Sequence, residues 1–98
     1  MSVFVNVRIK ASPDGLMKVS DAMPPIAERA KSLGCLHHRF LASEDGTTVV
    51  VVDEWETKEA FEKFFNEGED VRALMESAGV TEPPKVTFWR PLDTPDQF

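Results

Sequence analysis

The sequence predicts an α+β domain of the ferredoxin-like type, with the element order β-α-β-β-α-β. Three observations support this: an alternating strand at the start of the chain, a pair of apolar strands joined by a short turn in the middle, and helical periodicity on either side of that pair. The expected product is a four-stranded antiparallel sheet of strand order 4-1-3-2. The 98 residues make one domain that ends in a polar tail, residues 92–98.

The first part of the chain has the pattern of a strand followed by an interrupted helix. Residues 3–10, VFVNVRIK, alternate between the two faces of a strand. A Ser-Pro pair at 12–13 is typical of a helix start, and apolar residues then recur at helical spacing up to Leu33. Pro24-Pro25 predicts a kink or a restart of this helix, and Gly34 predicts its end.

The middle of the chain predicts a β-hairpin. Residues 35–42, CLHHRFLA, form its first strand, and residues 47–55, TTVVVVDEW, form its second. Asp45-Gly46 between them is expected to supply the positive φ angles of the turn.

The last part of the chain contains two helical segments and a final strand. Thr57 is a predicted N-cap, and the first helical segment is expected to break at Gly68. A second segment follows and stops at Gly79. Residues 84–92, PKVTFWRPL, predict the fourth strand.

Apolar residues on both faces of the sheet predict a homodimer. Two helices cover only one face, yet Val50 and Val52 point away from the face that Val49 and Val51 occupy. A patch of that kind is larger than a soluble monomer usually exposes. A second copy packed sheet to sheet with two-fold symmetry would cover it. The alternative is an outer face that is merely somewhat apolar.

The overall composition argues against several classes of protein. The formal net charge is -6, so the chain repels phosphate backbones, and no nucleic-acid partner is expected. A single cysteine allows no intrachain disulfide, which fits a reducing compartment. The chain shows neither a signal-peptide pattern nor an apolar run of transmembrane length, so no membrane partner is expected. Together these features predict a cytoplasmic protein.

Residues 49–65, VVVVDEWETKEAFEKFF, form the most specific pattern in the chain. An apolar strand ends in an acidic residue and Trp, and a Thr cap then opens a helix with Lys-Glu-Ala-Phe. Together with the preceding LGCLHHRF strand and Asp-Gly hairpin, this pattern resembles the antibiotic biosynthesis monooxygenase family. The likeness covers residues 3–88 and implies a dimeric α+β barrel.

The resemblance also implies a cofactor-independent monooxygenase. Its substrate would be an electron-rich phenol, quinol or anthrone, which can pass an electron to dioxygen once it has lost a proton. The protein then needs a dry pocket and a base or hydrogen-bonding group, but no metal or other cofactor. The expected partners are therefore a small aromatic molecule and dioxygen, and the expected pocket lies between the helices and the sheet, lined by aromatic side chains.

The chain departs from two patterns of the family. Some members use a tyrosine, and this sequence has none. The heme-degrading members place an iron-binding His on the second helix, and residues 57–79 contain no His. Two alternatives share the fold and stay open: a non-catalytic dimeric domain that binds a ligand or serves a structural role, and a non-redox isomerase.

Two candidate site residues come from the resemblance. Trp55 matches the Trp at the end of the third strand, which several relatives place at the substrate. Asn6 lies on the first strand, where heme-degrading relatives have an Asn. Each has a structural alternative: Trp55 as a core anchor, and Asn6 as a partner of a backbone group.

The adjacent histidines are candidates for a catalytic base. Neighbouring side chains of a strand point to opposite faces, so His37 and His38 cannot bind one metal ion together, and no zinc-site spacing is present. One of them, facing the pocket, could act as a general base. His38 is favoured because it shares its parity with Leu36 and Phe40, whereas His37 is expected beside Arg39 on the wetter face.

The remaining candidates are expected to bind substrate or to fill the core. Arg39 could bind a phenolate or carboxylate, or else form a surface ion pair. Strand alternation separates Cys35 from His38, which predicts a packed thiol rather than a nucleophile. The aromatic residues expected to line the pocket are Phe40, Phe61 and Phe64.

Overall fold

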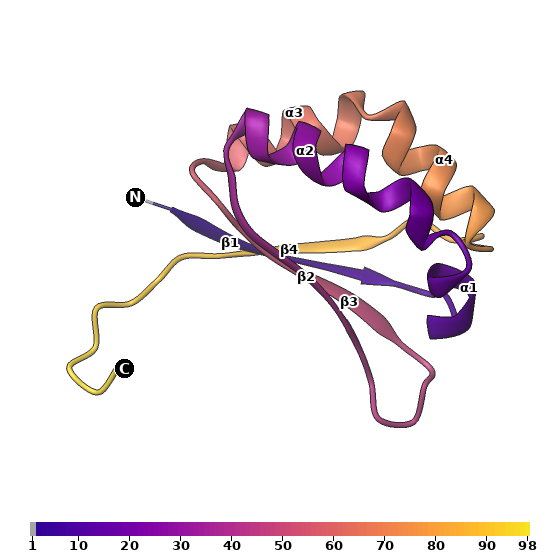
Figure 1. Ribbon diagram of the computed structural model, residues 1–98. Coiled ribbons are helices and arrows are strands. Elements are labelled where there is room, and N and C mark those ends of the chain that lie inside the picture. Colours follow the sequence, from indigo (N-terminus) through magenta and orange to yellow (C-terminus); the bar gives the residue numbers. More distant parts are fainter. Residues whose placement is uncertain (1) are drawn as a thin grey trace.

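The four strands form an antiparallel sheet in the order β2-β3-β1-β4 (Figure 1). This is the predicted 4-1-3-2 order counted from the opposite edge, so the ferredoxin-like topology is confirmed. The computed structural model describes residues 2–98. Its elements are β1 (Val3–Ile9), α1 (Pro13–Met17), the 3-10 helix η1 (Ser20–Ala22), α2 (Met23–Leu33), β2 (Cys35–Ala42), β3 (Val49–Trp55), α3 (Lys58–Glu67), α4 (Glu69–Ser77) and β4 (Lys85–Trp89).

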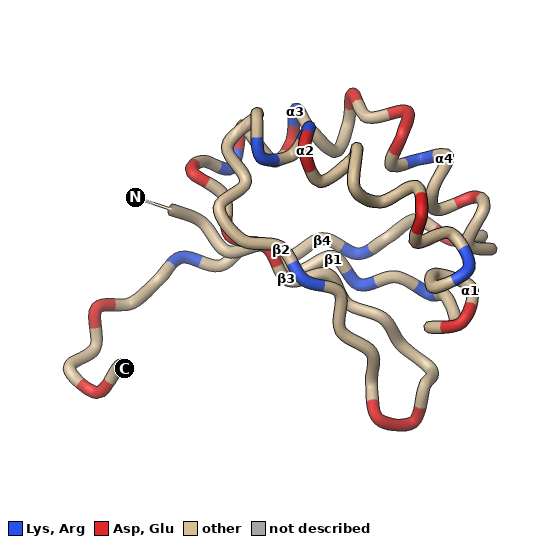
Figure 2. The backbone as a smooth tube through the Cα atoms, in the orientation of Figure 1, with Lys and Arg blue, Asp and Glu red and all other residues tan. Residues whose placement is uncertain are grey.

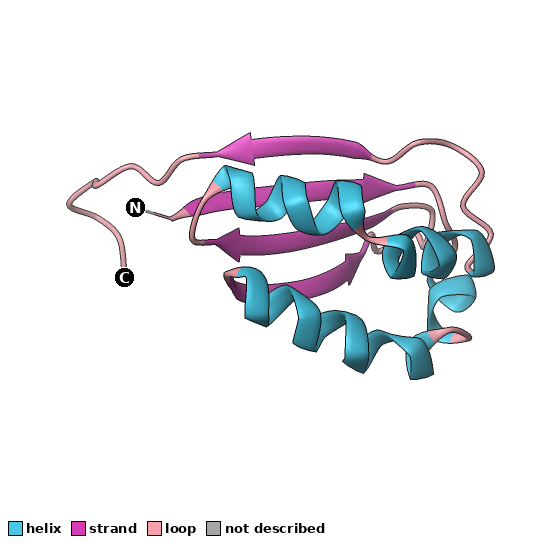
Figure 3. Ribbon diagram, turned by 90° about the horizontal axis from the view of Figure 1, so that it is seen from above, coloured by secondary structure: helices cyan, strands magenta, loops and turns pink. Residues whose placement is uncertain are grey.

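Helices α2, α3 and α4 all lie over one face of the sheet (Figures 1 and 3). Val5, Val7 and Ile9 of β1 point toward them and are at most 2% exposed. The core therefore lies between the helix layer and this face, where burying apolar side chains stabilises the fold. The opposite face of the sheet is covered by no element of residues 2–98 (Figure 1). No helix within that range is both long and apolar enough to span a bilayer.

Helix α2 begins at the two prolines instead of being kinked by them. Pro24 and Pro25 occupy its first turn, where a backbone N–H has no acceptor within the helix. The restart predicted from Pro24-Pro25 is thus confirmed, and the preceding residues form the separate segments α1 and η1. Gly34 ends α2 with a φ of 115°, a left-handed conformation that glycine adopts without steric penalty.

The β2–β3 turn differs from the prediction. Among the described residues, Gly46 has a positive φ of 73° but Asp45 does not. The loop is longer than a two-residue turn, because Ser43 N–H bonds to Thr48 O at 2.9 Å. Asp45 contributes through its side chain instead, accepting the Thr47 N–H at 3.1 Å.

Strand β2 contains a bulge that decides which side chains face the helices. Cys35 pairs with Trp55, yet His38, three residues later, pairs with Asp53, only two residues away on β3. The extra residue is accommodated around Leu36, which is 46% exposed. Cys35 and His38 therefore face the same side of the sheet. The expectation that alternation separates them is wrong, because the bulge interrupts the alternation.

Arg29 on α2 braces this helix against the junction of α3 and α4. Its Nε and Nη2 donate to the two carboxylate oxygens of Asp70 at 2.8 and 2.7 Å, and Nη2 also donates to Phe64 O at 3.1 Å. The guanidinium lies 4.3 Å from the centre of the Phe64 ring. A Cβ at Gly68 would collide with the guanidinium, so the glycine leaves room for this brace.

The Arg29–Asp70 ion pair should lose its stabilising effect at acidic pH. Hydrogen bonds from Arg29 lower the pKa of Asp70 below its ordinary value. The stabilisation is therefore complete above the unfolded-state pKa and is lost as the pH falls through the lowered folded-state pKa. Because the Asp70 side chain is 36% exposed, solvent screening limits the contribution to about 1 kcal/mol.

Urea unfolding across the acidic range measures this contribution. Asp70→Asn should reduce stability at pH 7 and flatten the decline toward acid. Asp93→Asn, in the exposed tail, should leave the curve unchanged. A decline that is equally steep in Asp70→Asn and in the unmodified protein would contradict the assignment to Asp70.

The open face of the sheet is partly apolar and partly basic. Phe4, Leu41 and Trp89 are 37%, 45% and 56% exposed there. Arg8 and Lys85 pair with each other in register on the same face. Acidic residues lie at the tip of the β2–β3 hairpin, in the C-terminal tail and along the helices (Figure 2), and Glu54 on the open face pairs with Phe4.

Candidate active site

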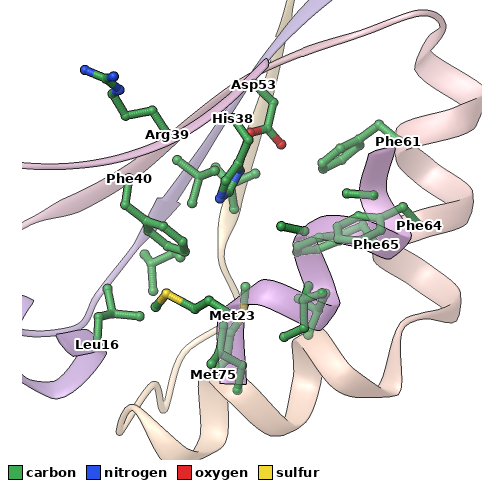
Figure 4. A pocket seen from close by; sticks show the side chains of 18 of the residues that line it. Leu16, Met23, His38, Arg39, Phe40, Asp53, Phe61, Phe64, Phe65 and Met75 are labelled. Atoms are coloured by element: carbon green, nitrogen blue, oxygen red, sulfur yellow. The ribbon is translucent and has the colours of Figure 1, made fainter. Parts of the chain in front are cut away.

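A pocket of about 420 Å³ lies between the helices and the sheet, as predicted (Figure 4). Ligand sites typically measure about 300–1,000 Å³, so the pocket can hold a small organic molecule. Its walls are almost entirely apolar, and the polar side chains are confined to one end. The apolar residues include Val7, Val51, Ala27, Phe40, Phe61, Phe64, Phe65, Met23 and Met75.

His38 and Asp53 form a hydrogen-bonded pair at the polar end of the pocket. His38 Nδ1 lies 2.7 Å from Asp53 Oδ1, and Trp55 Nε1 donates to Asp53 Oδ2 at 3.0 Å. Asp53 is 5% exposed and is the one buried charged residue among residues 2–98, whereas the His38 side chain is 40% exposed. The buried carboxylate thus has one N–H donor on each oxygen, which compensates for its loss of water.

The partners of Asp53 determine the tautomer of His38. A carboxylate only accepts hydrogen bonds, so Nδ1 of a neutral His38 must carry the proton. Nε2 then keeps its lone pair. The imidazole projects into the pocket from β2 (Figure 4), so this nitrogen is available as a base toward a bound molecule.

The pattern of β3 explains how the pair is assembled. Val49, Val51, Asp53 and Trp55 alternate onto the helix-facing side and are all buried. Asp53 is paired directly with His38 on β2. The sequence interpretation missed Asp53. Asp53 alternates in step with the apolar residues Val49 and Val51, which places an acidic side chain on the buried face of the strand. This pattern could have revealed it.

Trp55 lies behind the pair and outside the pocket wall. It is 0% exposed, and its ring centre lies 5.7 Å from that of Phe61 and 5.2 Å from that of Phe64. It is therefore a core anchor whose indole N–H also fixes the Asp53 carboxylate. Trp55 thus lies in the core, as its structural alternative had it, and it is not among the residues that line the pocket.

The chain matches one known protein family over most of its length. The model of the family described as antibiotic biosynthesis monooxygenase matches residues 2–76. The chain belongs to this family. The resemblance inferred from the strand–Trp–helix pattern is thus confirmed, and membership supports a monooxygenase activity. Comparison with curated proteins gives no match.

Several solved structures, a monooxygenase among them, share the fold of this chain. A monooxygenase from the gene ActVA-Orf6 of Streptomyces coelicolor, in complex with nanaomycin D, is 25% identical, with a TM-score of 0.71 over 95% of this chain and 89% of its own. Rv0793 from Mycobacterium tuberculosis is 20% identical, with a TM-score of 0.68 over 98% and 100% of the two chains. A Nitrosomonas europaea protein assigned to the family is 17% identical, with a TM-score of 0.70 over 94% and 91%.

In this family member the two histidines face opposite sides of the sheet. His38 and Phe40 line the pocket, and their rings meet edge to face with centres 5.2 Å apart. His37 lies on the open face, where its side chain is 80% exposed and its Nε2 is 3.9 Å from Glu54. Arg39 borders the pocket, but its side chain points away from it (Figure 4).

Asn6 does not share the pocket with His38. It lines a groove on the open face of the sheet, together with Arg8, Thr87 and Trp89. The reason is the alternation of β1, whose odd-numbered residues face the helices and whose even-numbered residues face away. The sequence grouped Asn6, a histidine and Trp55 around one cavity; the structure brings His38 and Trp55 together through Asp53 and places Asn6 elsewhere.

Cys35 lies on the same side as His38 but is poorly suited to nucleophilic chemistry. Burial, and secondarily the negative charge of Asp53, raises the pKa of the thiol to about 11. The thiol is therefore protonated near neutral pH, and the reactive thiolate is scarce. Within residues 2–98, no group of three or more His, Cys, Asp or Glu side chains is arranged to hold a metal ion.

Proposed function

We propose that this protein is a monooxygenase that oxidises a small, electron-rich hydroxyaromatic bound in the pocket between helices and sheet. The observation that carries the proposal is the His38–Asp53 pair, a base with a fixed tautomer at one end of an otherwise apolar pocket. A monooxygenase relative that is 25% identical was solved with an organic ligand, nanaomycin D, which supports a ligand-binding role.

His38 acts as the general base in this scheme. Its Nε2 accepts the proton of a substrate hydroxyl group, and the resulting imidazolium is stabilised by Asp53 through the 2.7 Å contact at Nδ1. This division of labour between a base and an orienting carboxylate follows the logic of the Ser-His-Asp triad. The apolar walls offer few hydrogen-bond partners to water, which would otherwise protonate the reactive anion.

The deprotonated substrate supplies the electrons for the oxygen step. For an anthrone, His38 would take the hydroxyl proton of the enol tautomer, which derives from the CH2 group. Overall the CH2 group loses both hydrogens and gains one atom of dioxygen as a carbonyl, and the second oxygen atom leaves with the two hydrogens as water. The protein's part is to remove the proton, hold the anion and keep it dry. The aromatic walls, including Phe40, Phe61 and Phe64, hold the substrate ring.

Oxygen consumption tests this function directly. The purified protein is supplied with a panel of quinols, anthrones and flavonols in the presence of a chelator and without added flavin. We expect oxygen uptake that matches substrate loss for at least one class. If no substrate is consumed, the proposal fails. Substrate conversion without oxygen uptake would instead indicate a non-redox reaction, such as an isomerisation, in the same pocket.

We also propose that the protein forms a homodimer through the open face of its sheet. Exposed Phe4, Leu41 and Trp89 on this face would be buried by a second copy. The basic strand residues and the acidic hairpin tip and tail provide opposite charges for such a contact (Figure 2). Two-fold pairing is the commonest closed arrangement of identical chains.

Light scattering measures the expected dimer. The particle mass should be about 22 kDa, twice the 11.0 kDa of the chain. Val52→Lys places a charge on β3, opposite Asn6 on the open face, and should produce a monomer. Thr81→Lys, on the exposed α4–β4 connection, adds the same charge and should remain dimeric. An 11 kDa particle for the unmodified protein would refute the dimer.

A further inference from the structure

The described part of the chain gives the pocket one negative charge and no facing cation. Its charged or titratable lining residues are His38, Arg39 and Asp53. The Arg39 side chain points away from the pocket (Figure 4). Arg29, on the helix layer above, does not line the pocket and donates its hydrogen bonds to Asp70 and to Phe64 O. Among residues 2–98, a protonated His38 is therefore the only positive charge that can face the pocket.

Proton transfer leaves the total charge of the occupied pocket unchanged. A neutral hydroxyaromatic enters beside the Asp53 carboxylate, and transfer then creates a substrate anion and an imidazolium together. The positive charge of the imidazolium therefore balances the negative charge of the substrate anion. Asp53, already paired with two N–H groups, holds that imidazolium in place.

A substrate that already carries a carboxylate would behave differently. It would bring a second negative charge into a space whose far end is formed by apolar side chains such as Met23, Met75 and Leu74. Moving an ion out of water is strongly unfavourable unless a cation or several hydrogen-bond donors receive it. The pocket offers neither at that end, and the charge of Asp53 adds repulsion.

We propose that the pocket selects uncharged hydroxyaromatic molecules and excludes analogues that carry a carboxylate. The selection against anions rests on the pocket lining alone. The preference for a hydroxyl group at the polar end rests on the proposed function of His38. The inference narrows the substrate class: the molecule that this protein oxidises carries no carboxylate and enters the pocket uncharged.

A matched pair of probes tests the selection by isothermal titration calorimetry under anaerobic conditions at pH 7. The probes are 2-naphthol and 6-hydroxy-2-naphthoic acid, which share the ring system and the hydroxyl group and differ in one carboxylate. We expect 2-naphthol to bind at least about tenfold more tightly. Equal or tighter binding of the carboxylate would overturn the proposal, and so would a failure of both probes to bind.

A positive charge placed at the far end should reduce the preference for the uncharged probe. Met75 lines the pocket from α4, across from His38 (Figure 4). Met75→Lys supplies a flexible cation there and should raise the affinity for 6-hydroxy-2-naphthoic acid at least about tenfold. Met17→Lys adds the same charge at a side chain that is 67% exposed and outside the pocket, and it should leave both affinities unchanged.

These measurements separate the inference from the proposed function. Binding without oxygen requires no turnover, so a protein that prefers 2-naphthol but consumes no oxygen with any substrate keeps the selectivity and loses the monooxygenase activity. Should Met75→Lys fail to fold, as judged by circular dichroism, the ratio of the two affinities in the unmodified protein still decides the proposal.

Discussion

His38→Gln is expected to lower kcat by about 10²–10⁴-fold, the range that a positioned general base contributes. Glutamine retains a polar side chain of similar reach but cannot take up the substrate proton at neutral pH. The effect should fall on kcat rather than on KM, because the apolar walls that hold the substrate ring are untouched. The measurement is oxygen uptake with a substrate identified in the quinol and anthrone panel.

Asp53→Asn should lower kcat by a comparable factor, because it changes which nitrogen of His38 carries the proton. The asparagine amide can donate to Nδ1 of His38 and so favour the tautomer that carries its proton on Nε2, which then has no lone pair for the substrate. In a serine protease the equivalent change lowers kcat by about 10⁴-fold. The change is nearly isosteric, so a folded variant of low activity is expected.

His37→Gln is the matched control. Its side chain is 80% exposed on the open face, and we expect activity to remain within about twofold of the unmodified protein because the residue touches neither pocket nor pair. Unchanged turnover in His38→Gln would contradict the proposed base. A loss in His37→Gln as large as that in His38→Gln would place the chemistry on the other face of the sheet.

The fold could be predicted because its signals are local. The alternation of β1, the apolar hairpin and the helix stop at Gly34 are each contained in a few neighbouring residues, and all agree with one topology. The conformation of the β2–β3 turn was harder to predict. Asp-Gly suggests a positive φ at Asp45, but Asp45 instead stabilises the turn through hydrogen bonds of its side chain.

The site was only half predictable because it depends on pairing between strands. His38 was assigned to the helix side on its shared parity with Leu36 and Phe40, and the structure keeps Phe40 beside it but not Leu36. The bulge near Leu36 carries no glycine or proline that would announce it. Its presence shifts the register, and that register brings His38 opposite Asp53.

For Asn6 the local sequence pattern was informative, but the family resemblance was given more weight in assigning its role. Its even parity on β1, shared with exposed Phe4, already indicated the face away from the buried valines. The correspondence with an asparagine of heme-degrading relatives grouped it with the pocket residues instead. A residue transferred from a family therefore needs its strand face checked before a role is assigned.

Trp55→Ala is expected to reduce the free energy of unfolding by about 3–5 kcal/mol, the usual range for removing a buried large aromatic. The side chain is 0% exposed and packs against Phe61 and Phe64. A small domain is stable by only about 5–15 kcal/mol, so this is a large share of the total. Urea unfolding followed by circular dichroism provides the measurement, with Met17→Ala, at a 67% exposed side chain, as the control.

Trp55→Phe separates packing from hydrogen bonding at the same position. Phenylalanine keeps most of the aromatic contact with Phe61 and Phe64 but leaves Asp53 Oδ2 without its donor at 3.0 Å. The expected loss is smaller, about 1–3 kcal/mol, which is the usual consequence of leaving a buried polar group unsatisfied. Stability equal to that of the unmodified protein would show that the indole N–H contributes nothing to holding the carboxylate.

The same variant decides whether Trp55 acts on turnover through Asp53. Without the indole donor the carboxylate is held by His38 alone, so its orientation toward Nδ1 should loosen and kcat should fall, though less than in Asp53→Asn. In the double variant Asp53→Asn with Trp55→Phe, the second change should then add little. If its effect on kcat instead multiplies with that of Asp53→Asn, Trp55 supports the pocket through the Phe61 and Phe64 wall and not through the carboxylate.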